Sequence, residues 1–136
     1  MNPIKEADIR FGFDPGNVQL LSGMSYGEFV RNLAKDMGST KSDLMHSAIG
    51  VAGEAGELLD AVKKHWVYDK PLDKDNVIEE LGDMIFYMQM MMMMLRLTPE
   101  QILEANWQKL AKRYHTGTYS NEQAQQRADK QEGETK

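Results

Sequence analysis

Two pairs of acidic residues have the type and spacing needed to hold a divalent metal ion. Glu54 and Glu57 stand three residues apart, as do Glu80 and Asp83, so each pair would project from one face of a helix. A ligand set made only of carboxylates suits a hard cation such as Mg²⁺ or Mn²⁺, which keeps positions open for water and phosphate oxygens. An ordinary solvated acidic face is the alternative interpretation of the same four residues.

The four acids can meet only if two helices place them at the same height. Apolar residues recur at steps of three and four over residues 40–65 and 73–95, and the segment between them contains Pro71 and has the usual length of a helix connection. The midpoints of the acidic pairs lie symmetrically about position 68.5, and the connection is centred on position 69.5. Because this offset is within roughly one residue rise of ~1.5 Å, an antiparallel hairpin would bring the four carboxylates together.

Such a cluster of like charges needs a compensating partner. Neighbouring carboxylates raise one another's pKa unless a cation lies between them, and no evident set of Lys or Arg residues shares the same two helix faces. The charge pattern therefore favours a bound metal ion.

Four glycines beside the acids also require an explanation. They lie inside the predicted helices, where each costs roughly 1 kcal/mol relative to Ala. A missing side chain allows a ligand or another backbone to approach closely, and tight helix packing is the alternative explanation. The four are Gly50, Gly53, Gly56 and Gly82.

Two further helices and two irregular ends complete the predicted organisation. Ser25 and Glu28 form a capping box that starts a helix running to Met37, where Gly38 ends it. Thr98, followed by a proline and a capping glutamine, starts a helix that continues to about Tyr114. We therefore expect an all-α domain of four-helix-bundle type over residues 25–119. An N-terminal arm or loop would occupy residues 1–24, and a flexible polar tail residues 120–136.

The second half of the third predicted helix is unusually rich in methionine. Seven of the chain's 11 methionines lie between Met84 and Met94, so this half is apolar around its whole circumference. A chain of 136 residues offers few elements to surround it. We therefore expect one methionine face to pack against another subunit, since interfaces between identical subunits resemble a divided core.

At two places the sequence resembles a known enzyme family. The segments GVAGEAGELL and EELGDMIFY contain Glu54-Ala-Gly-Glu57 and Glu80-Leu-Gly-Asp83, which look like the ExxE…ExxD signature of the all-alpha nucleoside triphosphate pyrophosphatases, the MazG-like proteins. The resemblance extends over about residues 25–119. It implies a Mg²⁺-dependent enzyme that cleaves a (d)NTP to (d)NMP and pyrophosphate, with these four acids as metal ligands and catalytic residues. It also implies a dimer or tetramer.

The fourth predicted helix contains a polar and cationic stripe. Asn106, Lys109 and Arg113 follow at steps of three and four, which from spacing alone is equally typical of an exposed face. The segment NWQKLAKRYHTGTYS resembles the family's C-terminal Asn, Lys and Arg-Tyr stretch. This resemblance implies that the three residues, together with Tyr114, bind the β and γ phosphates. Contacts with the base cannot be assigned among His46, Trp66, Phe86 and Trp107.

Composition excludes several other classes of function. The net charge of -5 disfavours a nucleic-acid partner, and the absence of cysteine excludes thiolate metal sites and cysteine nucleophiles. The longest apolar stretch, residues 84–95, is too short to cross a membrane, and no signal peptide is evident, so we expect a cytoplasmic protein. A phosphoribosyl-ATP pyrophosphatase-like enzyme and a non-catalytic, metal-binding helical assembly module remain the alternative functions.

Overall fold

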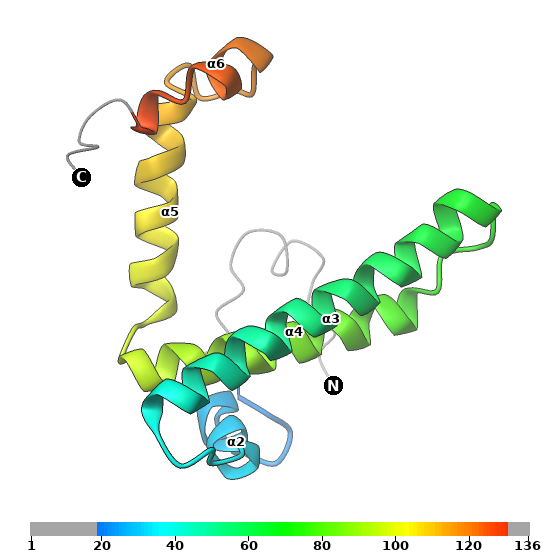
Figure 1. Ribbon diagram of the computed structural model, residues 1–136, viewed down its shortest axis with the longest axis vertical. Helices are drawn as coiled ribbons and strands as arrows, with labels where there is room; N and C mark the ends of the chain where they lie inside the picture. The colour runs from blue at the N-terminus through cyan, green and yellow to red at the C-terminus, as the bar shows by residue number, and fades with distance from the viewer. Residues whose placement is uncertain (1–18, 131–136) are drawn as a thin grey trace. The chain divides into compact units, whose positions relative to one another are not determined.

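The centre of the fold is a long antiparallel pair of helices. The computed structural model describes residues 19–130, and in it α3 (Thr40–Tyr68) and α4 (Lys74–Leu95) lie alongside each other, as Figure 1 shows. Each helix begins at a side-chain cap: Ser39 accepts a hydrogen bond from the Ser42 amide, and Asp73 accepts one from the Asn76 amide. The helical hairpin expected from the sequence is therefore present.

The register of this hairpin follows from one close contact. Gly50 on α3 faces the ring of Tyr87 on α4, and a Cβ atom added to the glycine would overlap that ring. These two residues lie symmetrically about position 68.5, the same centre that the acidic pairs have. The predicted register is thus the observed one. Helix α3 is longer than predicted: it continues to Tyr68, and Asp69 caps it in the left-handed conformation.

Helix α2 (Tyr26–Leu33) packs beside the end of the hairpin where α3 begins and α4 ends (Figure 1). The capping box predicted at Ser25 and Glu28 is present. The helix ends at Leu33, earlier than the predicted Met37. Side-chain hydrogen bonds compete here with helical ones: the backbone amide of Gly38 donates to the Asp36 carboxylate, and that of Met37 donates to the Asp43 carboxylate. These amides are then not available to a longer helix, and the segment forms the connection to α3.

The C-terminal helices form a second compact unit, divided from the first between Leu97 and Thr98. Helix α5 (Pro99–Arg113) starts at the predicted Thr98 capping box. Helix α6 (Asn121–Gln126) and the 3₁₀ helix η1 (Ala128–Lys130) follow it and pack back on it. The structure thus contains regular elements in part of the segment that the sequence assigned to a flexible polar tail. Residues 131–136 of that segment lie outside the described range.

The all-helical class is confirmed for the part of the chain that the structure describes. Between residues 19 and 130 it contains no strand, and the one isolated β-bridge joins Gln19 to Ser25. No helix in this range combines the length and the apolar character that crossing a membrane requires. The four-helix bundle stays a prediction because the two units are described separately, and most of the predicted N-terminal arm, residues 1–18, lies outside the described residues.

Candidate metal centre

Three of the four predicted acids come together across the helical hairpin. Glu54 and Glu57 extend from α3, Glu80 extends from α4, and one carboxylate oxygen from each lies within 4.8 Å of the others. Glu57 and Glu80 share the register set by the contact between Gly50 and Tyr87, so the backbone places them opposite each other. The arrangement offers three oxygen ligands from two rigid helices.

Glu80 is the most sheltered member of the cluster. It is only 6% exposed, and burial raises the pKa of its carboxyl, with the charge of Glu57 and the hydrogen bond and charge of Glu54 raising it further. Among residues 19–130, no Lys, Arg or His forms an ion pair with any of the three. The nearest lysines in sequence, Lys63 and Lys64, pair instead with Asp60, at 3.3 Å and 2.8 Å. A buried carboxylate beside a half-buried one (Glu54) and an exposed one (Glu57), without a protein cation, fits a divalent metal ion.

Asp83 lies outside this group of three. Its side chain is exposed, and its charge acts instead on Tyr26 of α2. Burial raises the pKa of the Tyr26 hydroxyl, and the negative charge of Asp83 raises it further. The assignment of Asp83 as a metal ligand therefore stays a prediction. Sequence reasoning did not identify Tyr26, because no spacing rule connects residues 57 positions apart in different elements.

The glycines beside the acids differ in their surroundings. The Tyr87 ring of α4 occupies the space that a side chain at Gly50 would need, so tight helix packing explains why this residue is glycine. An added Cβ at Gly53, Gly56 or Gly82 would have no neighbour within 4 Å in the described structure. The surface beside the acidic cluster is therefore open at these three positions, which leaves room for a ligand or another chain.

The polar stripe on α5 belongs to the second compact unit. Asn106 and Lys109 are exposed, whereas Arg113 is paired with Asp129 of η1 through two hydrogen bonds. Tyr114 caps the helix, and its ring contacts that of Tyr119 at a centroid distance of 5.6 Å. A joint site formed by this stripe and the acidic cluster stays a prediction. The sequence did not indicate Asp129 as a partner, because the segment that holds it was assigned to the tail.

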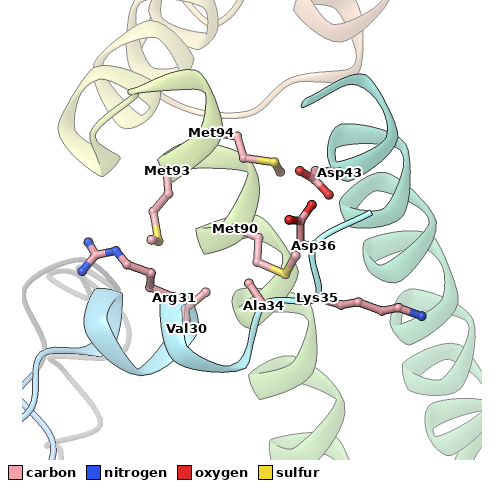
Figure 2. Close-up of a pocket in the computed structure, with 9 residues that line it drawn as sticks. All are labelled: Val30, Arg31, Ala34, Lys35, Asp36, Asp43, Met90, Met93 and Met94. Atoms are coloured by element: carbon pink, nitrogen blue, oxygen red, sulfur yellow. The ribbon is translucent and has the colours of Figure 1, made fainter. Parts of the chain in front are cut away.

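A separate pocket of about 200 Å³ lies at the α2 end of the hairpin. Figure 2 shows Met90, Met93 and Met94 of α4 on one side, and the carboxylates of Asp36 and Asp43 close together on another. Both carboxylates accept backbone hydrogen bonds at 2.7 Å, which explains their position in the connection between α2 and α3. None of the four predicted metal ligands lines this pocket, so it is distinct from the metal centre.

The four side chains considered for base recognition have different environments. Trp66 and Trp107 are largely exposed, whereas Phe86 packs against Tyr87 with ring centroids 5.4 Å apart. His46 meets the same tyrosine ring edge-on at 5.8 Å, and its Nδ1 atom is buried without a hydrogen-bond partner. Base recognition therefore remains unassigned.

Comparison with known proteins identifies one family. A family model described as the MazG nucleotide pyrophosphohydrolase domain matches residues 44–118, which is more than half of the chain. The matched range contains almost all of α3, the whole of α4 and α5, and therefore all four predicted metal ligands. No curated protein and no solved structure matches the chain.

Proposed function

The chain belongs to the MazG nucleotide pyrophosphohydrolase family, and on this basis we propose that it is a Mg²⁺-dependent enzyme that cleaves a (d)NTP to (d)NMP and pyrophosphate. The observation that carries the proposal is the cluster of Glu54, Glu57 and Glu80 inside the matched region. Its oxygens lie close enough to share one cation, and its most buried member has no cationic partner in the described part of the chain. Burial of Glu80 beside two other acids favours a bound cation over an ordinary solvated acidic surface.

In this proposal all four acids bind the metal ion, and one of them has a second task. Glu54, Glu57 and Glu80 hold the metal ion, with Asp83 as a further ligand from the next turn of α4. A bound Mg²⁺ or Mn²⁺ would offset phosphate charge and lower the pKa of a water that attacks the α phosphorus. One carboxylate of the cluster accepts the proton of that water as general base. The rigid backbone of the hairpin fixes the distances between these groups.

The phosphates that leave as pyrophosphate need a cationic site. We assign their binding to Asn106, Lys109, Arg113 and Tyr114, whose exposed or half-buried side chains supply donors, with part of the Arg113 guanidinium already paired with Asp129. Lys109 acts as a point charge, and the planar guanidinium of Arg113 can donate two parallel hydrogen bonds to one phosphate. The chain would thus combine an acidic metal site with a basic phosphate site.

The activity is tested by measuring pyrophosphate release with Mg²⁺ and a panel of dNTPs, NTPs and phosphoribosyl-ATP. We expect release from at least one nucleoside triphosphate, and a loss on the order of 100-fold in Glu57→Gln, which keeps the side-chain shape but removes a charge on the metal. Glu79→Gln is the matched control because Glu79 is exposed, lies next to Glu80 and is not in the cluster. Full turnover by Glu57→Gln would exclude the metal site. Binding of Mn²⁺ without any turnover would leave the assembly module as the function.

Asp83 is tested by its effect on metal affinity. If the ion draws the exposed Asp83 carboxylate toward the cluster, Asp83→Asn raises the Mg²⁺ concentration needed for half-maximal activity about tenfold, because one charged ligand is lost. A Mg²⁺ titration at saturating nucleotide measures this. An unchanged midpoint would show that Asp83 is not a ligand, while leaving the other three acids unaffected.

A further inference from the structure

A two-point ion pair joins Arg113 of α5 to Asp129 of η1 within the second compact unit. The Nε of Arg113 donates to Oδ1 of Asp129 at 2.7 Å, and one terminal nitrogen donates to Oδ2 at 2.9 Å. The Asp129 side chain is 1% exposed, and that of Arg113 is 20% exposed. The hydrogen bonds from Arg113 lower the pKa of Asp129 to about 2, so the pair is ionised at neutral pH. This is a two-point, charge-assisted contact with little access to water.

The segment that carries Asp129 is held in place by its own network. Gln123 of α6 is buried, and its side-chain amide donates to Thr116 at 2.9 Å and to Ser120 at 3.0 Å. The backbone then turns at Arg127 in the left-handed conformation and enters η1. Asp129 therefore meets Arg113 from a fixed position, although 16 residues separate them and the family match ends at residue 118.

The geometry leaves part of the guanidinium unused by Asp129. An arginine side chain has five N–H groups in one plane, and Asp129 takes those on the edge formed by Nε and one terminal nitrogen. The opposite edge, formed by the two terminal nitrogens, has the same fork geometry and fits a second oxyanion. The Tyr114 side chain, which is also assigned to phosphate binding, interacts with the same guanidinium. An arginine that is hydrogen-bonded along one edge is oriented before its ligand binds. A free arginine loses conformational entropy when the ligand orders it, which weakens binding.

We propose that Asp129 is a positioning residue, which holds Arg113 by one edge so that the other edge receives a phosphate of the triphosphate. The inference rests on the proposed function, since that function supplies the phosphate. The competing effect is electrostatic, because the negative charge of Asp129 weakens the attraction of Arg113 for anions. Since the buried carboxylate is already paired, we expect the orienting effect to exceed the loss of charge.

The test measures binding of inorganic tripolyphosphate, in the presence of Mg²⁺, to the full chain by titration calorimetry. We expect about tenfold weaker binding in Asp129→Asn and in Arg113→Lys, and no further weakening in the double variant, because both changes abolish the same oriented fork. Glu122→Gln is the control: Glu122 is an exposed acid of the same segment, so its loss changes the net charge alone. Binding by Asp129→Asn that equals or exceeds that of Glu122→Gln overturns the proposal, as does a wild-type chain that does not bind tripolyphosphate.

A second measurement reads binding on the wild-type chain and uses a variant only to assign one signal. The Nε–H signal of Arg113 in a ¹⁵N NMR spectrum is assigned by its loss in Arg113→Lys. We expect this proton to stay protected from exchange with solvent when tripolyphosphate binds, because Asp129 stays hydrogen-bonded to the Nε edge of the guanidinium. Loss of protection would show that phosphate displaces Asp129, which contradicts a positioning role.

Turnover separates this proposal from the proposed function. If the chain hydrolyses a nucleoside triphosphate, Asp129→Asn should raise KM several-fold and change kcat by less than about twofold, since only ground-state phosphate binding is affected. A merely structural role would lower the amount of active protein, and hence kcat, at unchanged KM. If tripolyphosphate binds as expected but no nucleotide is hydrolysed, the proposed function fails and the positioning role stands.

Discussion

Individual side chains determine the charge state of the candidate site. Glu80 is nearly enclosed, and it sits with two other carboxylates and no protein cation in the described structure. Such an arrangement is unfavourable for the fold in the absence of a ligand, because the charged form loses water and faces like charges. A site that costs stability without its ligand is typical of binding and catalytic centres.

The pH dependence of stability follows from the raised pKa of Glu80. Because folding raises this pKa above its ordinary value of 4.5, the metal-free fold gains stability below that value and loses the gain as the pH rises through the raised pKa. Glu80→Gln removes the effect. We therefore expect the melting temperature of the variant, relative to wild type in EDTA, to rise as the pH increases from about 4.5 through the raised pKa. Asp129, whose pKa is lowered to about 2, is present in both proteins, so its contribution cancels in this difference.

The control for this measurement is again the exposed neighbour Glu79. Glu79→Gln removes a charge from the same helix that is the smallest cause of the raised pKa of Glu80, so its difference should rise with pH much less than that of Glu80→Gln. Saturating Mg²⁺ should reverse the order at neutral pH, so that wild type becomes the more stable protein, because the ion binds the charged cluster. A variant less stable than wild type in EDTA at neutral pH would contradict the charge assignment.

At the scale of the helices, the contact between α3 and α4 fixes the distance between the acidic residues. The helices approach closely at Gly50 because the ring of Tyr87 occupies the space of the absent side chain. Gly53, Gly56 and Gly82 have no such contact, so within the described chain their helical cost is not compensated. One glycine thus serves the hairpin, and the other three leave an open surface beside the carboxylates.

Substitution of these glycines should separate the two roles. Gly50→Ala forces the Tyr87 ring away, and we expect a net loss of about 1–3 kcal/mol in unfolding free energy, because overpacking exceeds the gain in helix propensity. Gly53→Ala meets open space and should raise stability by up to ~1 kcal/mol. Chemical denaturation measures both values. If Gly53→Ala also impairs nucleotide turnover, its face is covered by the substrate or a neighbouring subunit, and a stabilised Gly50→Ala would refute the packing role of Gly50.

At the scale of the whole molecule, the described chain buries little apolar surface. Only four hydrophobic side chains between residues 19 and 130 are buried, namely Val30, Ala61, Met90 and Met92. Leu59 of α3 and Ile78 of α4 share the hairpin register and are 66% and 67% exposed. Exposed apolar residues beside open glycines are typical of an interaction surface, and this supports the predicted dimer or tetramer.

Self-association is tested by light scattering coupled to size-exclusion chromatography. We expect wild type to elute as a dimer or tetramer, and the double substitution Leu59→Lys and Ile78→Lys to give a monomer, because two charges would enter an apolar contact. Leu21→Lys is the control: Leu21 is 85% exposed and lies outside the helices, so its substitution should leave the oligomer intact. A wild-type monomer at high concentration would exclude this surface as an interface.

The parts of this protein that could be predicted from sequence are those governed by neighbours within one or two helical turns. The capping boxes at Ser25 and Thr98 are hydrogen bonds between residues three apart, and the hairpin register follows from helical periodicity and the length of one connection. The two segments that resemble the family, GVAGEAGELL and EELGDMIFY, are likewise short. Local geometry leaves such features few alternatives.

The remaining features depend on where distant segments meet. Asp83 shares the register of the other acids, yet its side chain is exposed outside the cluster, because a carboxylate can turn about its own bonds toward a different neighbour. The end of α2 at Leu33 depends on Asp43, which reaches back from another helix. The pairing of Arg113 with Asp129 requires α6 and η1 to fold back on α5. The sequence of this segment is polar and has no apolar periodicity that would predict such packing. Contacts of this kind are selected by the packing of the folded chain, which decides which distant groups meet, and a charge that packing buries, such as Asp129, needs a partner there.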